Sequence, residues 1–181
     1  MIRVTVDSIR VSLLTQHRVV VLRESDSRRY LPIWIGPFEA DAIQLALEGT
    51  QPHRPMTHDL ALRLIEPLGG TVQQIVINRI AEATFYAEIT LAANGQTHII
   101  DARPSDAIAL AVRNGAPIYV EQHVLDQAGV PLDEDESVAS EDPAPPDEPE
   151  KEPSEEGLTL FRDFINTLDL DDDNRRKDQQ S

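Results

Sequence analysis

The sequence of 181 residues contains no cysteine. Disulfide frameworks, thiolate metal sites and redox chemistry at cysteine are therefore excluded. No uninterrupted apolar run approaches the ~20 residues that a membrane span needs. Residues 1–7 alternate between polar and apolar side chains, unlike a secretory signal peptide. We therefore expect a soluble, cytoplasmic protein without a membrane partner.

Basic charge is scarce and unevenly distributed. The chain has 16 Lys and Arg against 32 Asp and Glu. Residues 1–125 hold 11 Arg and 13 acidic residues, net −2, whereas residues 126–181 hold 5 basic and 19 acidic residues, net −14. Because nonspecific nucleic-acid affinity comes mostly from Lys and Arg that neutralise phosphates, a polybasic binder is excluded. A small local site remains compatible, since Arg can contact a phosphate through two nitrogens at once.

Apolar residues make up 40% of the sequence, which is enough for one packed domain with an appendage. We assign the domain to residues 1–130. Residues 131–153 contain six Pro, ten acidic residues and one Lys. Such a segment cannot bury enough apolar surface to offset the entropy of ordering it. The sequence therefore predicts a disordered acidic linker.

Apolar residues return at helical spacing in residues 154–170, which predicts a short amphipathic helix, followed by a disordered polar tail over 171–181. The apolar positions are Leu158, Phe161, Phe164, Ile165 and Leu168. A helix of about 14 residues is marginal alone in water. We therefore expect this helix to dock on its own domain or on a second copy of the chain, or else on a different protein partner.

Alternating patterns within the domain predict strands, and patterns with a period near 3.6 predict helices. Strands are expected over residues 2–13, 18–22, 30–35, 72–80, 84–92, 97–102 and 117–121. Helices are expected over residues 38–48, 57–68, 104–113 and 123–128. Thr57 suits the N-cap of the second helix, and Asn94-Gly95 is a strong hairpin signal.

These elements form two β-β-β-α units, each with a further helix after it. Residues 41–47 match residues 106–112 at a constant offset, and the same offset places Ile35 on Ile100. We therefore predict an α+β fold of duplicated units, although two amphipathic helices rich in Ala and Leu can also match by chance. Duplication would place the N-termini of the two main helices in corresponding positions, where we expect the chemistry.

The densest polar cluster lies at residues 101–106, where a strand turns directly into a helix. Asp101 and Asp106 supply the oxygen ligands that Mg²⁺ or Mn²⁺ prefers. Arg103 and the Ser105 hydroxyl, with the free N–H groups of the helix N-terminus, can hold an anion such as phosphate. In the structural alternative, Ser105 and Asp106 cap the helix while Arg103 pairs with Asp101.

The corresponding turn of the first unit, residues 36–41, places Glu39 at a helix N-terminus, as a capping residue or a further metal ligand. Residues 53–59 bring two His, an Arg and an Asp together. A neutral His58 can accept a proton from an attacking water while Asp59 orients the ring. Adjacent residues of a helix face different directions, so spacing alone does not make these two a dyad.

Several common catalytic motifs are absent, namely the Walker loop, the dinucleotide fingerprint, the nucleophile elbow and the zinc-protease helix. Tyr30 and Trp34 share one face of a predicted strand, because they are an even number of residues apart. We interpret them as core or subunit-interface residues rather than as a platform for base stacking. The candidate chemistry therefore rests on the polar clusters.

Four motifs in the order LPIWIG, RPMTHDL, TFYA and DARPSDAIALA resemble those of the bifunctional nuclease domain family. The resemblance covers about residues 1–130, and the acidic linker and final helix are similar to those of bacterial, particularly actinobacterial, members. It implies an α+β domain that associates into dimers or larger assemblies, and a nuclease activity on DNA and RNA. It implies no established catalytic set.

Our working hypothesis is metal-assisted phosphodiester hydrolysis. Asp101, Asp106 and Glu39 would hold Mg²⁺ or Mn²⁺, and Arg103 would neutralise charge that develops on the phosphate, while His58 with Asp59 would position or deprotonate water. The competing hypothesis is a non-enzymatic oligomeric module whose tethered helix docks on a partner or on the domain itself. The acidic linker can also imitate nucleic acid and occupy the Arg-bearing face, which would make it autoinhibitory.

Overall fold

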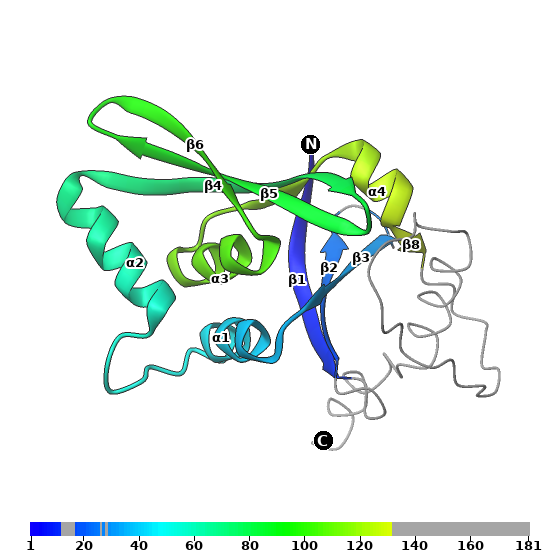
Figure 1. Cartoon of the computed structure of the whole chain (residues 1–181), viewed down its shortest axis with the longest axis horizontal. Coiled ribbons are helices and arrows are strands. Elements are labelled where there is room, and N and C mark those ends of the chain that lie inside the picture. The colour runs from blue at the N-terminus through cyan, green and yellow to red at the C-terminus, as the bar shows by residue number, and fades with distance from the viewer. Residues whose placement is uncertain (12–16, 26, 28, 132–181) are drawn as a thin grey trace, which may run out of the picture. The chain divides into compact units, whose positions relative to one another are not determined.

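A computed structural model of the chain describes residues 1–11, 17–25, 27 and 29–131, and Met1–Pro131 forms one compact unit (Figure 1). The predictions for residues 132–153, for the helix over 154–170 and for the tail over 171–181 lie outside the described residues.

The described part of the chain contains one sheet of eight strands and four α-helices, so the α+β prediction is confirmed. The strands are β1 Ile2–Val11, β2 Arg18–Glu24, β3 Arg29–Ile35, β4 Gly70–Ala81, β5 Thr84–Ala93, β6 Gln96–Ala102, β7 Ile118–Val120 and β8 Val130–Pro131. The helices are α1 Pro37–Leu47, α2 Thr57–Ile65, α3 Pro104–Asn114 and α4 Gln122–Ala128, and a 3₁₀ turn, η1, covers Glu66–Leu68. None of these helices has the length and apolar composition to cross a membrane.

The strand order in the sheet is β6-β5-β4-β7-β1-β2-β3-β8. Only β4 and β7 pair in parallel, and the other neighbouring pairs are antiparallel. Two antiparallel meanders, β1-β2-β3 and β4-β5-β6, thus lie on either side of β7, and each is followed along the chain by a helix, α1 or α3. This order matches the two predicted β-β-β-α units, and their origin by duplication stays a prediction.

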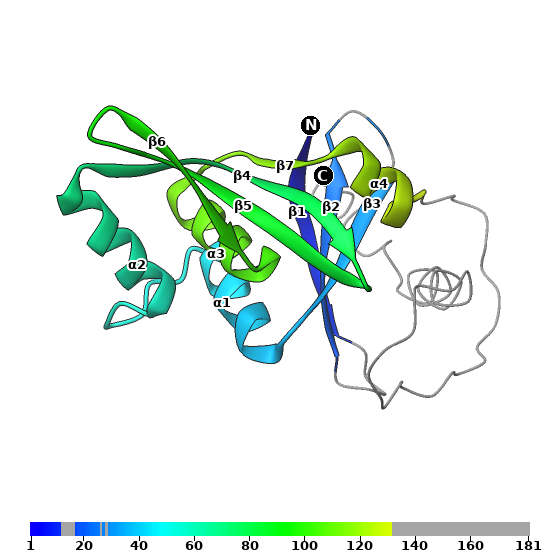
Figure 2. The same cartoon turned by 45° about the horizontal axis from the view of Figure 1, so that its top comes forward.

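Helices α1 and α3 pack against each other, with α3 also on β4 and β5 and α1 on β2 (Figures 1 and 2). Ile43 of α1 and Ile108 of α3 are fully buried, as are Leu22 of β2 and Ile75 of β4. Burying such a side chain stabilises the fold by about 1.5–3 kcal/mol. The two helix N-termini are therefore held at fixed positions by one continuous core.

The hairpins connect β4 to β5 and β5 to β6. Asn94 and Gly95 have φ values of 51° and 75° and join paired strands, which confirms the predicted turn. Glu82 and Ala83 also have positive φ, 48° and 57°, although neither is glycine. The left-handed region costs a non-glycine residue about 1 kcal/mol, so the turn between β4 and β5 is strained.

The predicted N-cap of α2 is wrong by one residue. Met56 is the N-cap, and Thr57 is already the first helical residue. The Met56 N–H donates to Asp59 Oδ2 at 2.9 Å. Asp59, the third helical residue, therefore makes the contact to the N-cap N–H that is one half of a capping box.

Candidate functional site

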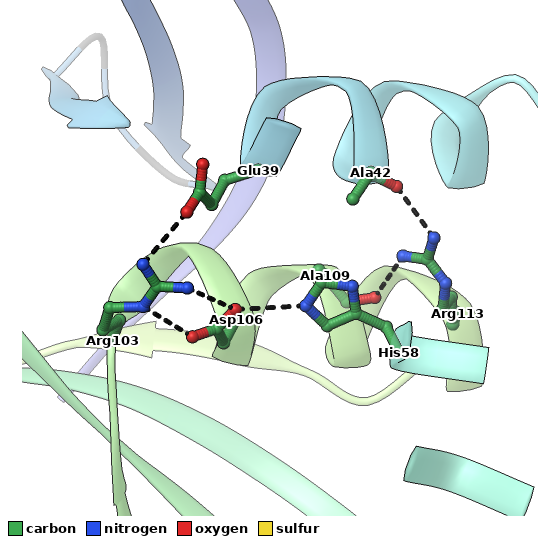
Figure 3. Close-up of polar contacts among 7 residues, drawn as sticks. All are labelled: Glu39, Ala42, His58, Arg103, Asp106, Ala109 and Arg113. Carbon is green, nitrogen blue, oxygen red and sulfur yellow. Dashed lines mark hydrogen bonds and ion pairs between the residues drawn. The ribbon is translucent and has the colours of Figure 1, made fainter. Parts of the chain in front are cut away.

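Arg103 connects the N-termini of the two main helices. It is the N-cap of α3, between the end of β6 and the buried Pro104 at the first helical position. Its Nε and Nη2 donate to Asp106 Oδ2 at 2.7 Å and Oδ1 at 3.1 Å, and Nη1 donates to Glu39 Oε1 of α1 at 3.0 Å (Figure 3). Its side chain is nevertheless 65% exposed, so the guanidinium is held in place and accessible.

Gly36, the N-cap of α1, allows Glu39 to reach this position. The Glu39 carboxylate folds back over the start of α1, and a Cβ at residue 36 would collide with it. The φ of Gly36 is −70°, which any residue can adopt. The glycine therefore leaves room for the carboxylate at this position, and a larger residue here would displace the flexible end of the Glu39 side chain.

His58 joins the same network from α2. Its Nε2 lies 3.2 Å from Asp106 Oδ1, and its side chain is 14% exposed (Figure 3). Asp106 thus accepts hydrogen bonds from Arg103 on one side and faces the imidazole of His58 on the other. Three helices that are separate in the sequence thus contribute to one continuous polar row, which consists of Glu39, Arg103, Asp106 and His58.

Asp59 does not belong to this row, and the predicted role of Asp59 in orienting His58 is wrong. Its Oδ1 accepts a hydrogen bond from Arg113 Nε at 2.9 Å. Arg113 also donates to the carbonyls of Ala109 at 2.8 Å and Ala42 at 2.9 Å, which ties α1, α2 and α3 together. Successive residues of a helix point about 100° apart, so His58 and Asp59 have different partners.

The three predicted metal ligands are not gathered at one point. Glu39 and Asp106 share the Arg103 guanidinium, whereas Asp101 is exposed on β6, opposite Glu88 of β5. The expected alternative pairing of Arg103 with Asp101 is also replaced by these two contacts. Across residues 1–11, 17–25, 27 and 29–131, no three His, Cys, Asp or Glu side chains are grouped so as to hold a metal ion. As arranged, these carboxylates do not fit a metal centre.

A pocket of about 300 Å³ opens beside Arg103. Its walls come from the end of β3, the start of α1, the start of α3 and the strained β4-β5 hairpin, and the lining side chains include Trp34, Glu39, Phe85, Arg103 and Ser105. Ser105 is 6% exposed. Asp106 and His58 are not among the lining residues of the described chain, so the polar row runs from the interior toward the pocket.

Trp34 is 46% exposed, which excludes its interpretation as a core residue. Alternation in β3 assigns Leu31 and Ile33 to the buried face, where they are 0% and 2% exposed. The ring of His17 packs edge-on against the indole with centroids 5.6 Å apart. A large apolar side chain at the pocket is therefore accessible and oriented.

The charges of the row stabilise one another. Burial raises the pKa of Asp106, but the hydrogen bonds from Arg103 and His58 and the positive charge of the Arg103 guanidinium outweigh this effect, so the pKa lies below its usual value. The hydrogen bond to Asp106 raises the pKa of Arg103. Burial likewise raises the pKa of Asp59, and the Met56 N–H with Arg113 more than offsets it, so that pKa is also lowered. At neutral pH, Asp59, Asp106 and Arg103 are therefore charged.

The sequence analysis predicted strands β4 and β5 but missed two features of the site, Arg113 and the left-handed turn between these strands. Arg113 lies seven residues after Asp106, and this spacing places both side chains on one face of α3. The spacing is the sequence feature from which a role for Arg113 could have been predicted. The hairpin at Glu82 and Ala83 carries no glycine or asparagine, so its left-handed conformation has no sequence signal of the usual kind.

Comparison with known proteins identifies the family. Residues 20–133 match the bifunctional nuclease domain. An uncharacterized protein of Mycobacterium tuberculosis is 40% identical over 171 residues, which cover 93% of this chain and 96% of that relative. Bifunctional nuclease 2 of Oryza sativa subsp. japonica is 28% identical over 118 residues, 64% of this chain and 36% of the relative. Bifunctional nuclease 1 of Arabidopsis thaliana is 25% identical over 132 residues, 71% of this chain and 41% of the relative. The chain therefore belongs to the bifunctional nuclease domain family.

Proposed function

We propose that this protein is a nuclease that hydrolyses phosphodiester bonds of DNA or RNA. The observation that carries the proposal is the row His58, Asp106, Arg103 and Glu39, which ends at the pocket. The names of the plant relatives support this reaction class.

In the proposed reaction, Arg103 binds the scissile phosphate. A guanidinium has five N–H donors, and three hydrogen bonds to Asp106 and Glu39 use three of them. The remaining donors can contact two phosphate oxygens and stabilise the charge that develops on them during attack. The Ser105 hydroxyl, at the pocket wall, is a further donor to phosphate.

Water is the proposed nucleophile, and the proposed base is either His58, which is connected to the pocket through Asp106, or Glu39, which lines it. In the tautomer with the proton on Nε2, Asp106 accepts the hydrogen bond from Nε2–H, Nδ1 is left to accept a proton from water, and the carboxylate stabilises the imidazolium that forms. The water oxygen forms the new bond to phosphorus, and the bond to the leaving ribose or deoxyribose oxygen breaks. Glu39 lines the pocket itself and is the second candidate for the base.

The requirement for Mg²⁺ or Mn²⁺ stays a proposal. We derive no step through a metal, because Glu39 and Asp106 are both paired with Arg103 and Asp101 stands apart. A metal requirement would mean that these side chains rearrange in the presence of substrate.

Cleavage of fluorescent single-stranded DNA and RNA by the full-length protein tests the proposal, with Mg²⁺, Mn²⁺ or chelator in parallel. Loss of one donor to a developing oxyanion typically lowers kcat on the order of 10²-fold, and we expect this for Arg103→Gln. Arg23→Gln, at an exposed position on β2, is the matched control and should keep full activity. Equal rates for wild type and Arg103→Gln would contradict the proposal.

The second candidate is an oligomeric interaction module, and α2 carries the observation that favours it. Met56, Leu60, Leu64 and Leu68 recur every four residues along α2 and η1 and are 39%, 49%, 61% and 72% exposed. A contiguous exposed stripe of this kind is typical of an interaction surface. Its occupant would be a second copy of the chain or a partner helix, including the predicted helix over 154–170. Sedimentation of wild type and Leu64→Glu over a range of concentrations tests for self-association.

A further inference from the structure

We propose that the pocket beside Arg103 binds one unstacked base of a single-stranded nucleic acid, with the base against the indole of Trp34 and the adjacent phosphate at Arg103. This inference rests on the proposed nuclease function and names its substrate class. Trp34 becomes a specificity-determining residue rather than a core or interface residue.

The pocket has the two kinds of wall that a nucleotide needs. Trp34 and Phe85 provide apolar surface from β3 and β5, while Arg103 and Ser105 provide hydrogen-bond donors from the start of α3. Its volume of about 300 Å³ lies at the lower end of the range for small-molecule sites. A single base with its sugar and phosphate is a ligand of that size, and a duplex is not.

Phosphate attraction alone is weak at this site. Glu39 and Asp106 lie within hydrogen-bonding distance of Arg103 and offset its charge. Residues 1–125 as a whole carry net −2 and no Lys. Most of the affinity must therefore come from contact with the base, and an exposed indole offers the largest such contact, because every base has a π-face.

Duplex substrates cannot use this contact. A base inside a duplex has both faces covered by its neighbours, and extruding it costs a few kcal/mol. A single strand presents its bases to an aromatic side chain without that cost. The pocket therefore selects single strands, whether DNA or RNA.

Trp34 is the sole tryptophan of the chain, so it reports directly on its own contacts. The first experiment titrates the full-length protein with a non-cleavable phosphorothioate oligothymidine of about ten nucleotides. We expect quenching of the tryptophan fluorescence, because a stacked base quenches an indole. The same oligonucleotide without bases, and a hairpin duplex of equal charge, should bind at least tenfold more weakly and quench little.

The salt dependence supplies a second measurement. For single strands the slope of log K against log salt is about −0.7 per neutralised phosphate. With Arg103 as the main phosphate contact, we expect a slope of about −0.7. A slope of −4 or steeper would mean that a wider electrostatic surface dominates and would overturn the inference.

Variants separate stacking from structure, with affinity measured by anisotropy of a labelled oligonucleotide. Stacking on an aromatic residue changes affinity by about 5- to 150-fold per base, so Trp34→Leu should weaken binding within that range, and Trp34→Phe should restore most of it. Phe38→Leu is the control, because Phe38 is 83% exposed on α1 and is outside the pocket lining. Unchanged binding by Trp34→Leu would overturn the inference, whether or not the sedimentation coefficient of this variant differs from that of wild type.

Two outcomes distinguish this inference from the proposed function. Binding that depends on Trp34 in a protein without cleavage activity would remove the nuclease and keep the base site. Cleavage of single strands by Trp34→Leu with an unchanged KM would keep the nuclease and remove the base site.

Discussion

His58 Nε2 lies 3.2 Å from Asp106 Oδ1, although the two residues are 48 positions apart in the sequence. The contact brings α2 to the start of α3, where Arg103 holds the other side of the same carboxylate. Asp106 is thus the one group that both the proposed phosphate ligand and the proposed base share.

Replacement of the Asp106 carboxylate should therefore affect both phosphate binding by Arg103 and proton transfer by His58. We expect Asp106→Asn to lower kcat by at least 10²-fold, because the amide cannot accept both nitrogens of Arg103 or stabilise an imidazolium. Steady-state cleavage of a single-stranded substrate measures the effect. A circular dichroism melt checks that the fold is retained.

Asp101→Asn is the matched change, five residues earlier on β6. Because Asp101 is exposed and outside the polar row, we expect the cleavage rate of the Asp101→Asn variant to stay within twofold of the wild-type rate. A large loss at Asp101 together with dependence on Mg²⁺ or Mn²⁺ would instead support the metal hypothesis and contradict the arrangement described for the free protein.

Arg113 should matter for stability more than for chemistry. Its side chain is 9% exposed, and it holds Asp59 and the carbonyls of Ala42 and Ala109. We expect Arg113→Met to lower the free energy of unfolding by about 2 kcal/mol, since it leaves several partners without a donor. Urea denaturation measures the loss, and Arg23→Met should change it little.

The free energy of unfolding should fall in acid, because carboxylates such as Asp59 become protonated. The pKa of Asp59 is lowered in the folded state by the Met56 N–H and Arg113, against the effect of burial. Its contribution to the free energy of unfolding is therefore fully present above the unfolded-state pKa of about 3.9 and is lost as the pH falls through the lower folded-state pKa. Denaturation midpoints from pH 7 to pH 3 should fall less steeply for Asp59→Asn than for wild type. Parallel curves for the two proteins would be inconsistent with this linkage.

The strained hairpin offers a stabilising substitution. Ala83 has φ 57°, and glycine adopts this conformation without the steric cost of a Cβ. We expect Ala83→Gly to raise the free energy of unfolding by about 0.5 kcal/mol, after the extra entropy of glycine in the unfolded chain is subtracted. Ala92→Gly, in the extended part of β5, should lower it by about 0.5–1 kcal/mol. A lower melting temperature for Ala83→Gly would contradict the strain.

Removal of the acidic segment tests autoinhibition. A chain that ends at Pro131 keeps every described strand and loses residues 132–181, which hold 5 basic and 18 acidic residues. If the segment competes with nucleic acid for the arginine side chains of the domain, the shortened protein should bind single strands more tightly than the full-length protein at low salt. Equal affinity of the two proteins would rule the competition out.

The sequence by itself determined the order of the elements and the family. Period-2 patterns and the Asn94-Gly95 turn are local signals, because each depends on the backbone preferences of a few neighbouring residues. Four motifs, among them those in residues 31–36 and 101–111, carried the family resemblance, which the domain match over residues 20–133 confirms.

Only the tertiary structure decided which polar groups meet. Sequence analysis paired His58 with Asp59 and Asp101 with Asp106 because they are close in the sequence, and it placed Glu39 with them only through the predicted duplication. The core places the start of α3 beside α1 and α2, and this gives Asp106 to His58 and Asp59 to Arg113. Exposure of Trp34 was likewise undetermined, because alternation along a strand assigns a face and does not say what covers it.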